Sequence, residues 1–126
     1  MTPKFTYVGI RVKDMGESIA FYTELFGMKL QGRSRIEATG GEVATLTSED
    51  GGFPLELNYY PKGSRFDQEY HVGEGLDHLS FQVEDLEAFL KKSKERGHKV
   101  PEDIRAKTSR WAYVEDPNGI WVEVFQ

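Results

Sequence analysis

The sequence predicts an α+β fold of two β-α-β-β-β modules, which form one curved mixed sheet around a cavity. Two observations support this class. A glycine-containing turn followed by an alternating strand occurs twice, at residues 49–58 and again at 116–125. Each half also begins with an alternating strand that leads into an acid-capped helix. Because an internal repeat fixes the architecture, we expect both halves to fold alike within a single domain, residues 1–126.

The first module is predicted at about residues 5–60. Val8, Ile10 and Val12 alternate with polar or small residues, which is typical of a half-buried strand. Asp14, with Glu17 three residues later, predicts the start of a helix that ends at Gly27. Strands are then expected at residues 28–36, 42–47 and 53–60, separated by pairs of glycines.

The second module is predicted at about residues 77–126. Leu79, Phe81 and Val83 alternate in a strand, and Asp85 caps a helix that is closed by Gly97. Further strands are expected near residues 98–105, 110–115 and 120–125. Residues 61–76 form a polar linker, and a loop of this length in a compact domain usually has a function.

The composition excludes several classes of protein. A net charge of −5, without a basic stripe, argues against nucleic acid as a partner. The absence of cysteine excludes disulfides, thiol nucleophiles and thiolate metal sites. No apolar run approaches the roughly 20 residues that span a bilayer, and no signal-type stretch follows the first residues. We therefore expect a cytoplasmic protein with no membrane partner.

The polar strand faces carry the candidate site. If the apolar faces pack against the helices, the opposite faces line a common surface that includes Glu56, His78 and Glu123. Such nitrogen and oxygen ligands suit Zn, Mn, Fe, Ni or Co. Each residue alone is more often a solvated strand residue than a metal ligand, but Glu56 precedes Glu123 by 67 residues, at a repeat-equivalent position. The candidate substrate-binding residues on the same surface are Tyr7, Arg11, Asn58, Tyr60, Trp121 and Phe125.

The paired modules, Asp116-Pro117-Asn118-Gly119 before the last strand, and the strand ends at residues 12–14 and 83–85 resemble the vicinal-oxygen-chelate superfamily. It includes glyoxalase I, extradiol dioxygenases, fosfomycin-resistance enzymes and bleomycin-resistance proteins, and the pattern is most similar to glyoxalase I. The family's four metal positions fall here on Tyr7, Glu56, His78 and Glu123. Tyr7 departs from the His or Gln of the glyoxalase I branch, and a neutral phenol is a poor ligand.

The resemblance implies one divalent metal ion, bound by Glu56, His78 and Glu123. It also implies a metal-dependent glyoxalase-like lyase or isomerase that acts on a small carbonyl substrate through a metal-bound enediolate, with Glu123 as the general base. Arg11 matches an arginine that glyoxalase I directs at glutathione, whereas Tyr60 and Glu74 replace other glutathione contacts. Two alternatives remain open: a non-catalytic bleomycin-resistance-like binding protein with a degenerate metal site, and a dioxygenase-type relative.

The resemblance also implies a homodimer with shared sites. In glyoxalase I relatives the ligands come from two chains, which here places Glu56 opposite His78 and Glu123 of the partner subunit. The sixteen-residue linker, if extended, could span up to roughly 50 Å. A small-molecule substrate is the other expected partner.

Overall fold

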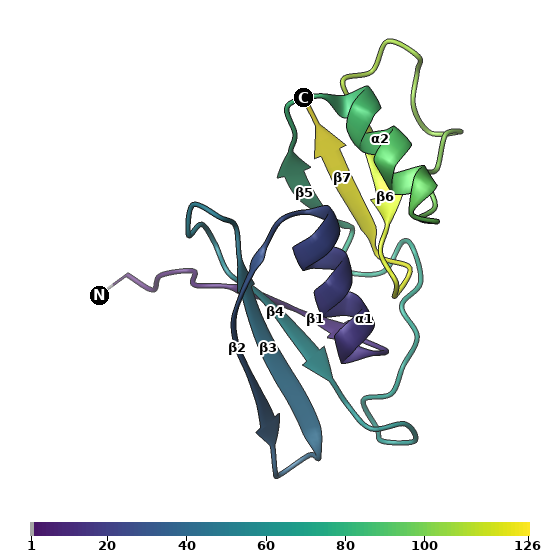
Figure 1. Cartoon of the computed structure of the whole chain (residues 1–126). Coiled ribbons are helices and arrows are strands. Elements are labelled where there is room, and N and C mark those ends of the chain that lie inside the picture. Colours follow the sequence, from purple (N-terminus) through teal and green to yellow (C-terminus); the bar gives the residue numbers. More distant parts are fainter. Residues whose placement is uncertain (1) are drawn as a thin grey trace. The chain divides into compact units, whose positions relative to one another are not determined.

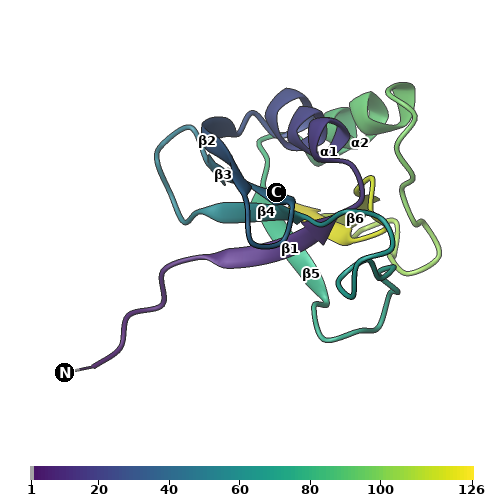
Figure 2. The ribbon, with the colours of Figure 1, turned by 90° about the horizontal axis from the view of Figure 1, so that it is seen from below.

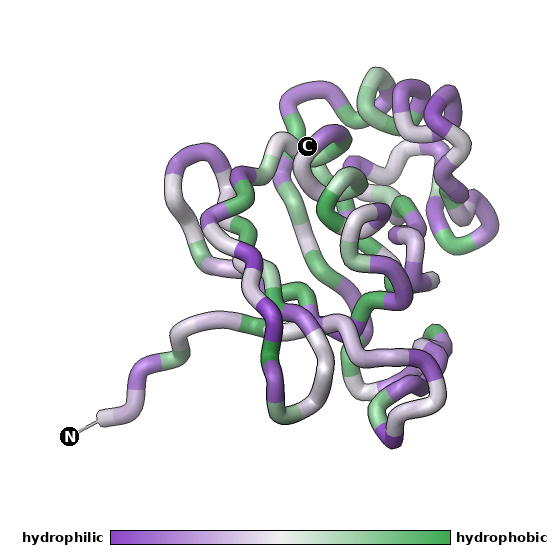
Figure 3. The backbone as a smooth tube through the Cα atoms, turned by 60° about the horizontal axis from the view of Figure 1, so that its bottom comes forward, coloured by the Kyte–Doolittle hydropathy of each residue, from purple (hydrophilic) through white to green (hydrophobic). Residues whose placement is uncertain are grey.

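The computed structural model describes residues 2–126 and divides the chain into two compact units, Met1–Gln68 and Glu69–Gln126 (Figure 1). The division falls inside the predicted linker. Each unit contains one mixed sheet and one helical segment, so the predicted α+β class is confirmed. The alternation of apolar and polar residues on which the prediction rested is visible along the chain in Figure 3.

The first unit is built on a four-stranded sheet in the order β1-β4-β3-β2. β1 (Val8–Val12) is parallel to β4 (Leu55–Tyr59), whereas β3 (Gly41–Thr47) is antiparallel to both β4 and β2 (Lys29–Ile36). One face of this sheet is apolar and buried, and it packs against α1 (Met15–Ala20) (Figure 2). The buried strand residues are Ile10, Val12, Ala44, Leu46, Leu55 and Leu57.

The helix of the first unit begins as predicted and ends in a wider turn. The Asp14 carboxylate accepts a hydrogen bond of 2.8 Å from the Glu17 backbone N–H, which is the expected cap. After Ala20 the helix continues as a π-helical turn, η1 (Phe21–Leu25). Gly27 ends the segment with a φ of 67°, a conformation that favours glycine.

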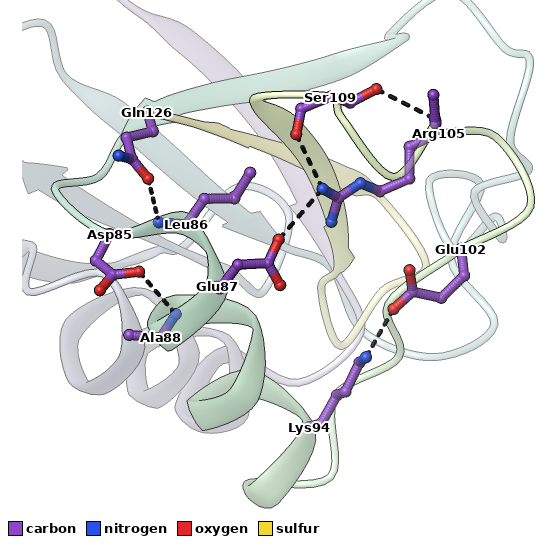
Figure 4. A network of polar contacts seen from close by, with 10 residues as sticks. Asp85, Leu86, Glu87, Ala88, Lys94, Glu102, Arg105, Ser109 and Gln126 are labelled. Atoms are coloured by element: carbon purple, nitrogen blue, oxygen red, sulfur yellow. Dashed lines mark hydrogen bonds and ion pairs between the residues drawn. The ribbon is translucent and has the colours of Figure 1, made fainter.

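The second unit is built on a three-stranded sheet in the order β5-β7-β6. β5 (His78–Gln82) is parallel to β7 (Trp121–Phe125), and β6 (Trp111–Glu115) is antiparallel to β7. α2 (Leu86–Glu95) is capped by Asp85, whose carboxylate accepts a 3.0 Å hydrogen bond from the Ala88 N–H (Figure 4). The core of this unit contains Leu86, Leu90, Ala112, Val114, Ile120, Val122 and Val124.

The strand predicted near residues 98–105 is wrong. This segment forms turns and loop, so the second unit is β-α-β-β rather than β-α-β-β-β. Pro101 has no N–H to donate to a strand ladder. Side chains hold the loop instead: Arg105 Nη2 donates to the Ser109 carbonyl at 3.0 Å and lies 3.4 Å from Glu87 Oε1, while Lys94 pairs with Glu102 at 2.6 Å (Figure 4).

The predicted linker is folded into turns. The Ser64 N–H donates to the Pro61 carbonyl at 3.1 Å, and the Gly63 N–H donates to Asp67 Oδ2 at 2.8 Å. Further along, the Tyr70 hydroxyl donates to the Leu76 carbonyl at 2.5 Å. A span of roughly 50 Å would therefore require these hydrogen bonds to open. Between residues 2 and 126, none of the helices has the length and apolarity needed to cross a membrane.

Candidate functional site

The polar face of the second sheet carries two of the predicted ligands on neighbouring strands. The parallel register of β5 and β7 pairs Ser80 with Glu123 and His78 with Trp121. Because alternate residues of a strand share a face, His78, Ser80 and Glu123 lie on the same side, with His78 one diagonal step from Glu123. On the other flank of β7, the register places Tyr113 of β6 directly opposite Glu123.

Glu123 is held by its neighbour on β5. The Ser80 hydroxyl donates to Glu123 Oε1 at 2.7 Å, which leaves Oε2 for another partner. Tyr113 borders the same carboxylate. Burial raises the pKa of Tyr113 above its ordinary value, and the negative charges of Glu123 and Asp77 raise it further. The phenol is therefore neutral at physiological pH and keeps its O–H as a donor.

Among the residues that the structure describes, the hydrogen-bonding partner of His78 lies at one ring nitrogen. Its Nδ1 lies 2.6 Å from Asp77 Oδ1, so Nδ1 is engaged and Nε2 is the nitrogen left for a ligand. The ring also meets Tyr113 edge-on, with centroids 5.4 Å apart. Nε2 of His78 and Oε2 of Glu123 are hard donors, and this chemistry fits a first-row divalent ion.

An aromatic cluster surrounds this pair. The Tyr113 ring lies 5.0 Å from the Trp121 ring and 5.7 Å from the Trp111 ring, measured between centroids. Sequence reasoning named Trp121 and Phe125 but missed Trp111, Tyr113 and Asp77. The alternation of residues 111–115 could have predicted the two aromatics. Tyr113 is paired with Glu123, so it lies on the same face, and Trp111, two residues earlier in the strand, shares that face.

The polar face of the first sheet carries the other predicted residues. Glu56 of β4 is half-buried and lies opposite Gly9 of β1 and Thr45 of β3, while Asn58 pairs with Arg11. A Cβ at Gly9 would lie only 2.9 Å from Asn58 Nδ2, so glycine leaves room for that amide.

Two predicted substrate-binding residues lie at the borders of this face. Tyr7 precedes β1 and is 49% exposed. Tyr60 follows β4, and its ring packs at 4.7 Å on Phe66 of the linker segment.

The predicted site residues are thus divided between the units. Tyr7, Arg11, Glu56, Asn58 and Tyr60 belong to the first unit, and His78, Trp121, Glu123 and Phe125 to the second. Within the described residues, 2–126, no three His, Asp or Glu side chains are gathered so that they could hold a metal ion. The structure brings His78 and Glu123 onto one face, and the full set with Glu56 remains a prediction.

Comparisons with known proteins match almost the whole chain. The sequence profile of the "Glyoxalase/Bleomycin resistance protein/Dioxygenase superfamily" matches residues 4–124. The chain is 33% identical to the "Uncharacterized protein YwbC" of Bacillus subtilis, over 100% of this chain and 99% of that protein. It is 30% identical to "Lactoylglutathione lyase GLX1" of Arabidopsis thaliana, over 98% of this chain, but it spans only 44% of that protein's length.

A solved structure shares the fold. The trypanothione-dependent glyoxalase I of Leishmania major is similar with a TM-score of 0.81 and 25% sequence identity, over 99% of this chain and 87% of that one. This likeness extends over both units of the chain described above.

Proposed function

The chain belongs to the glyoxalase/bleomycin resistance protein/dioxygenase superfamily, and from this premise we propose that it is a metal-dependent, glyoxalase-like lyase or isomerase acting on a small carbonyl substrate. One observation carries the proposal. His78 and Glu123 share a sheet face, and each already has a hydrogen-bonding neighbour that leaves its second donor atom available. The Arabidopsis and Leishmania relatives are named for glyoxalase chemistry, which agrees with this assignment.

The chain's own residues divide the work as follows. Glu56, His78 and Glu123 would hold one divalent ion, which when bound supplies Lewis-acid stabilisation of developing negative charge on carbonyl oxygens. The Glu123 carboxylate, which Ser80 holds through Oε1, would accept the proton from the hydroxyl-bearing carbon next to the carbonyl and return it to the former carbonyl carbon, while the hydroxyl proton moves to the oxygen of that carbon. Tyr113 lies opposite Glu123 in the strand register and packs against Trp121, so aromatic rings flank this carboxylate.

The proposed substrate is a carbonyl compound other than the glutathione adduct. Glu74 and Tyr60 stand where the glyoxalase I resemblance implies glutathione contacts, and an acid at residue 74 repels an anionic thiol cofactor. We expect kcat/KM on the glutathione hemithioacetal of methylglyoxal to lie below ~10⁴ M⁻¹s⁻¹. A value at or above that level would assign the glutathione adduct as the substrate.

The metal site is tested by uptake. Protein purified without chelator should titrate with one divalent ion per chain in calorimetry, and His78→Ala should lose most of this affinity. His71→Ala is the matched control, because His71 lies in an exposed turn of the linker segment. Equal metal uptake by the unsubstituted protein and His78→Ala would show that the proposed site is wrong.

A second candidate function is metal-independent binding of a flat small molecule. The exposed Tyr7 at a ligand position and the cluster of Trp111, Tyr113 and Trp121 favour it. Both tryptophans of the chain belong to this cluster, so intrinsic fluorescence reports on the face directly. Saturable quenching by a planar aromatic ligand in excess chelator, without turnover of any carbonyl substrate, would favour binding over catalysis.

The proposed assembly is a two-fold symmetric homodimer with shared sites. Isologous pairing generates two equivalent sites, each with Glu56 from one chain and two ligands from the other. Glu56→Ala and Glu123→Ala are therefore mixed and refolded. In a heterodimer both lesions fall in one site, so the other site should bind metal. If heterodimers form, by mass spectrometry, and bind no more metal than either parent, each site lies within one chain.

A further inference from the structure

Asp77, which immediately precedes β5, has no role assigned by sequence reasoning or by the comparisons. Its side chain is 82% exposed, yet its Oδ1 lies 2.6 Å from Nδ1 of His78, whose side chain is 33% exposed. An ionised carboxylate can only accept a hydrogen bond. A neutral imidazole engaged at this distance must therefore carry its proton on Nδ1, and the lone pair is then on Nε2.

We infer that Asp77 is a positioning residue: its carboxylate fixes His78 in the Nδ1–H tautomer and directs the unprotonated Nε2 outward as a metal ligand. The inference rests on the proposed function, because it takes His78 to be a ligand. Histidines that bind metals through one nitrogen typically donate the other N–H to a carboxylate or carbonyl, and losing that partner costs roughly 10- to 100-fold in metal affinity.

The backbone around Asp77 is held from the same unit. The Tyr70 hydroxyl donates to the Leu76 carbonyl at 2.5 Å and lies 3.5 Å from the Asp77 carbonyl oxygen. Burial, followed by the negative charges of Asp77, Glu74 and Asp116, raises the pKa of Tyr70, so the phenol remains a donor. The segment that enters β5 is thus fixed immediately before His78, and the Asp77 carboxylate starts from a defined backbone position.

One further contact of His78 defines what Asp77 adds. The Tyr113 and His78 rings form a T-shaped pair with centroids 5.4 Å apart, but this contact does not decide which nitrogen carries the proton. The Asp77–His78 hydrogen bond itself is exposed, and exposed contacts between such side chains contribute little to folding, about 0–1 kcal/mol. Removing Asp77 should therefore alter the tautomer and the metal affinity while leaving the unfolding transition almost unchanged.

The test compares Asp77→Ala, Asp77→Asn and Asp103→Ala. Asp103 is an exposed acid of the same unit with the same charge, so its removal controls for long-range electrostatics. Long-range ¹⁵N–¹H spectra of the metal-free protein at pH 8.5, above the ordinary histidine pKa of about 6.5, report the tautomer directly. The chain has three histidines, and His78→Ala assigns the relevant signals.

The variants are expected to differ in the tautomer of His78 and in their affinity for Co²⁺. His78 should be Nδ1–H in the unsubstituted protein, in Asp103→Ala and in Asp77→Asn, whose amide oxygen can still accept the hydrogen bond; Asp77→Ala should populate both tautomers. By calorimetry with Co²⁺, Asp77→Ala should bind 10- to 100-fold more weakly, Asp77→Asn less so, and Asp103→Ala as before. The inference is overturned if Asp77→Ala keeps the Nδ1–H tautomer or binds Co²⁺ within twofold of the parent.

The spectra separate this inference from the proposed function. If the unsubstituted protein takes up no Co²⁺, the metal-dependent activity is refuted, and the loss or retention of the tautomer in metal-free Asp77→Ala still decides whether Asp77 positions the ring.

Discussion

The hydrogen bonds of Asp116, in the turn before β7, predict how much stability the chain loses when this carboxylate is removed. The Asp116 carboxylate is buried and accepts three hydrogen bonds: from the backbone N–H of Asn118 and of Ile120, each at 2.8 Å, and from Asn118 Nδ2 at 3.0 Å. Asp116→Ala removes both acceptor oxygens and leaves the buried donors of these hydrogen bonds without this partner. Hydrogen bonds to charged groups contribute about 1.5–3 kcal/mol each, and unpaired buried groups cost about 1–3 kcal/mol.

Because these terms are not additive and water can enter near a turn, the expected loss in unfolding free energy is about 3–5 kcal/mol. Asp116→Asn retains one acceptor oxygen and should lose about 1–2 kcal/mol. The matched control is Asp50→Ala in the glycine turn before β4. Asp50 accepts a single exposed hydrogen bond of 3.1 Å from the Gly52 N–H, so this change should cost less than about 1 kcal/mol.

Urea titration measures these differences. Both tryptophans lie in the second unit, so their fluorescence follows the unfolding of that unit, while far-UV circular dichroism follows the whole chain. The reasoning would be refuted if Asp116→Ala stayed within about 1 kcal/mol of the parent, or if Asp50→Ala destabilised the chain as much.

Two further predictions concern the sheet of the first unit and the pH dependence of stability. A Cβ at Gly41 would lie 2.4 Å from the Tyr59 carbonyl oxygen, so Gly41→Ala should lower the free energy of unfolding by about 1–3 kcal/mol, as measured by thermal unfolding. The control is Gly32→Ala, whose Cβ would have no atom within 4 Å and which should stay within about 0.5 kcal/mol of the parent. Equal effects of the two substitutions would contradict this reasoning. Burial, and then the charge of Arg96, lower the pKa of His98, so the unfolded chain binds the proton first as pH falls below about 6.5. Stability should therefore decrease from there down through the folded-state pKa, and His98→Gln should flatten this part of the pH profile; an unchanged slope would contradict it.

Local signals predicted most of the fold. The caps at Asp14 and Asp85 are confirmed by hydrogen bonds from the third residue after each, and the first strand buries Ile10 and Val12 as predicted. The apolar residues of β5 are only half-buried. The predicted strand near residues 98–105 fails because alternation alone does not provide backbone partners. Ile104 of that segment is 37% exposed, and Arg105 is tied to α2 and to Ser109. Side-chain tethers of this kind have no periodic signature in a sequence.

The part of the candidate site that could be predicted is the part that follows from the alternation of side chains between the two faces of a strand. This alternation predicted that His78 and Glu123 lie on one face, and the register of β5 and β7 confirms that they do. It did not reveal that Asp77 pairs with His78, because neighbouring residues of a strand point to opposite faces and Asp77 lies just outside β5. Nor did it predict the π-helical turn of residues 21–25, which shifts the register of side chains without altering composition.

The repeat is asymmetric in a way that bears on function. The turn before β7 has a buried carboxylate with three hydrogen bonds, whereas the corresponding turn before β4 has one exposed bond. The strand after the buried turn carries Glu123, bonded to Ser80 and beside His78, which has its own partner. In the first unit Glu56 lies opposite glycine and threonine. Precise placement of ligand atoms requires neighbours that restrict their rotamers. The second unit is therefore the preorganised part of the proposed site, and substitutions there should weaken metal binding more than substitutions around Glu56.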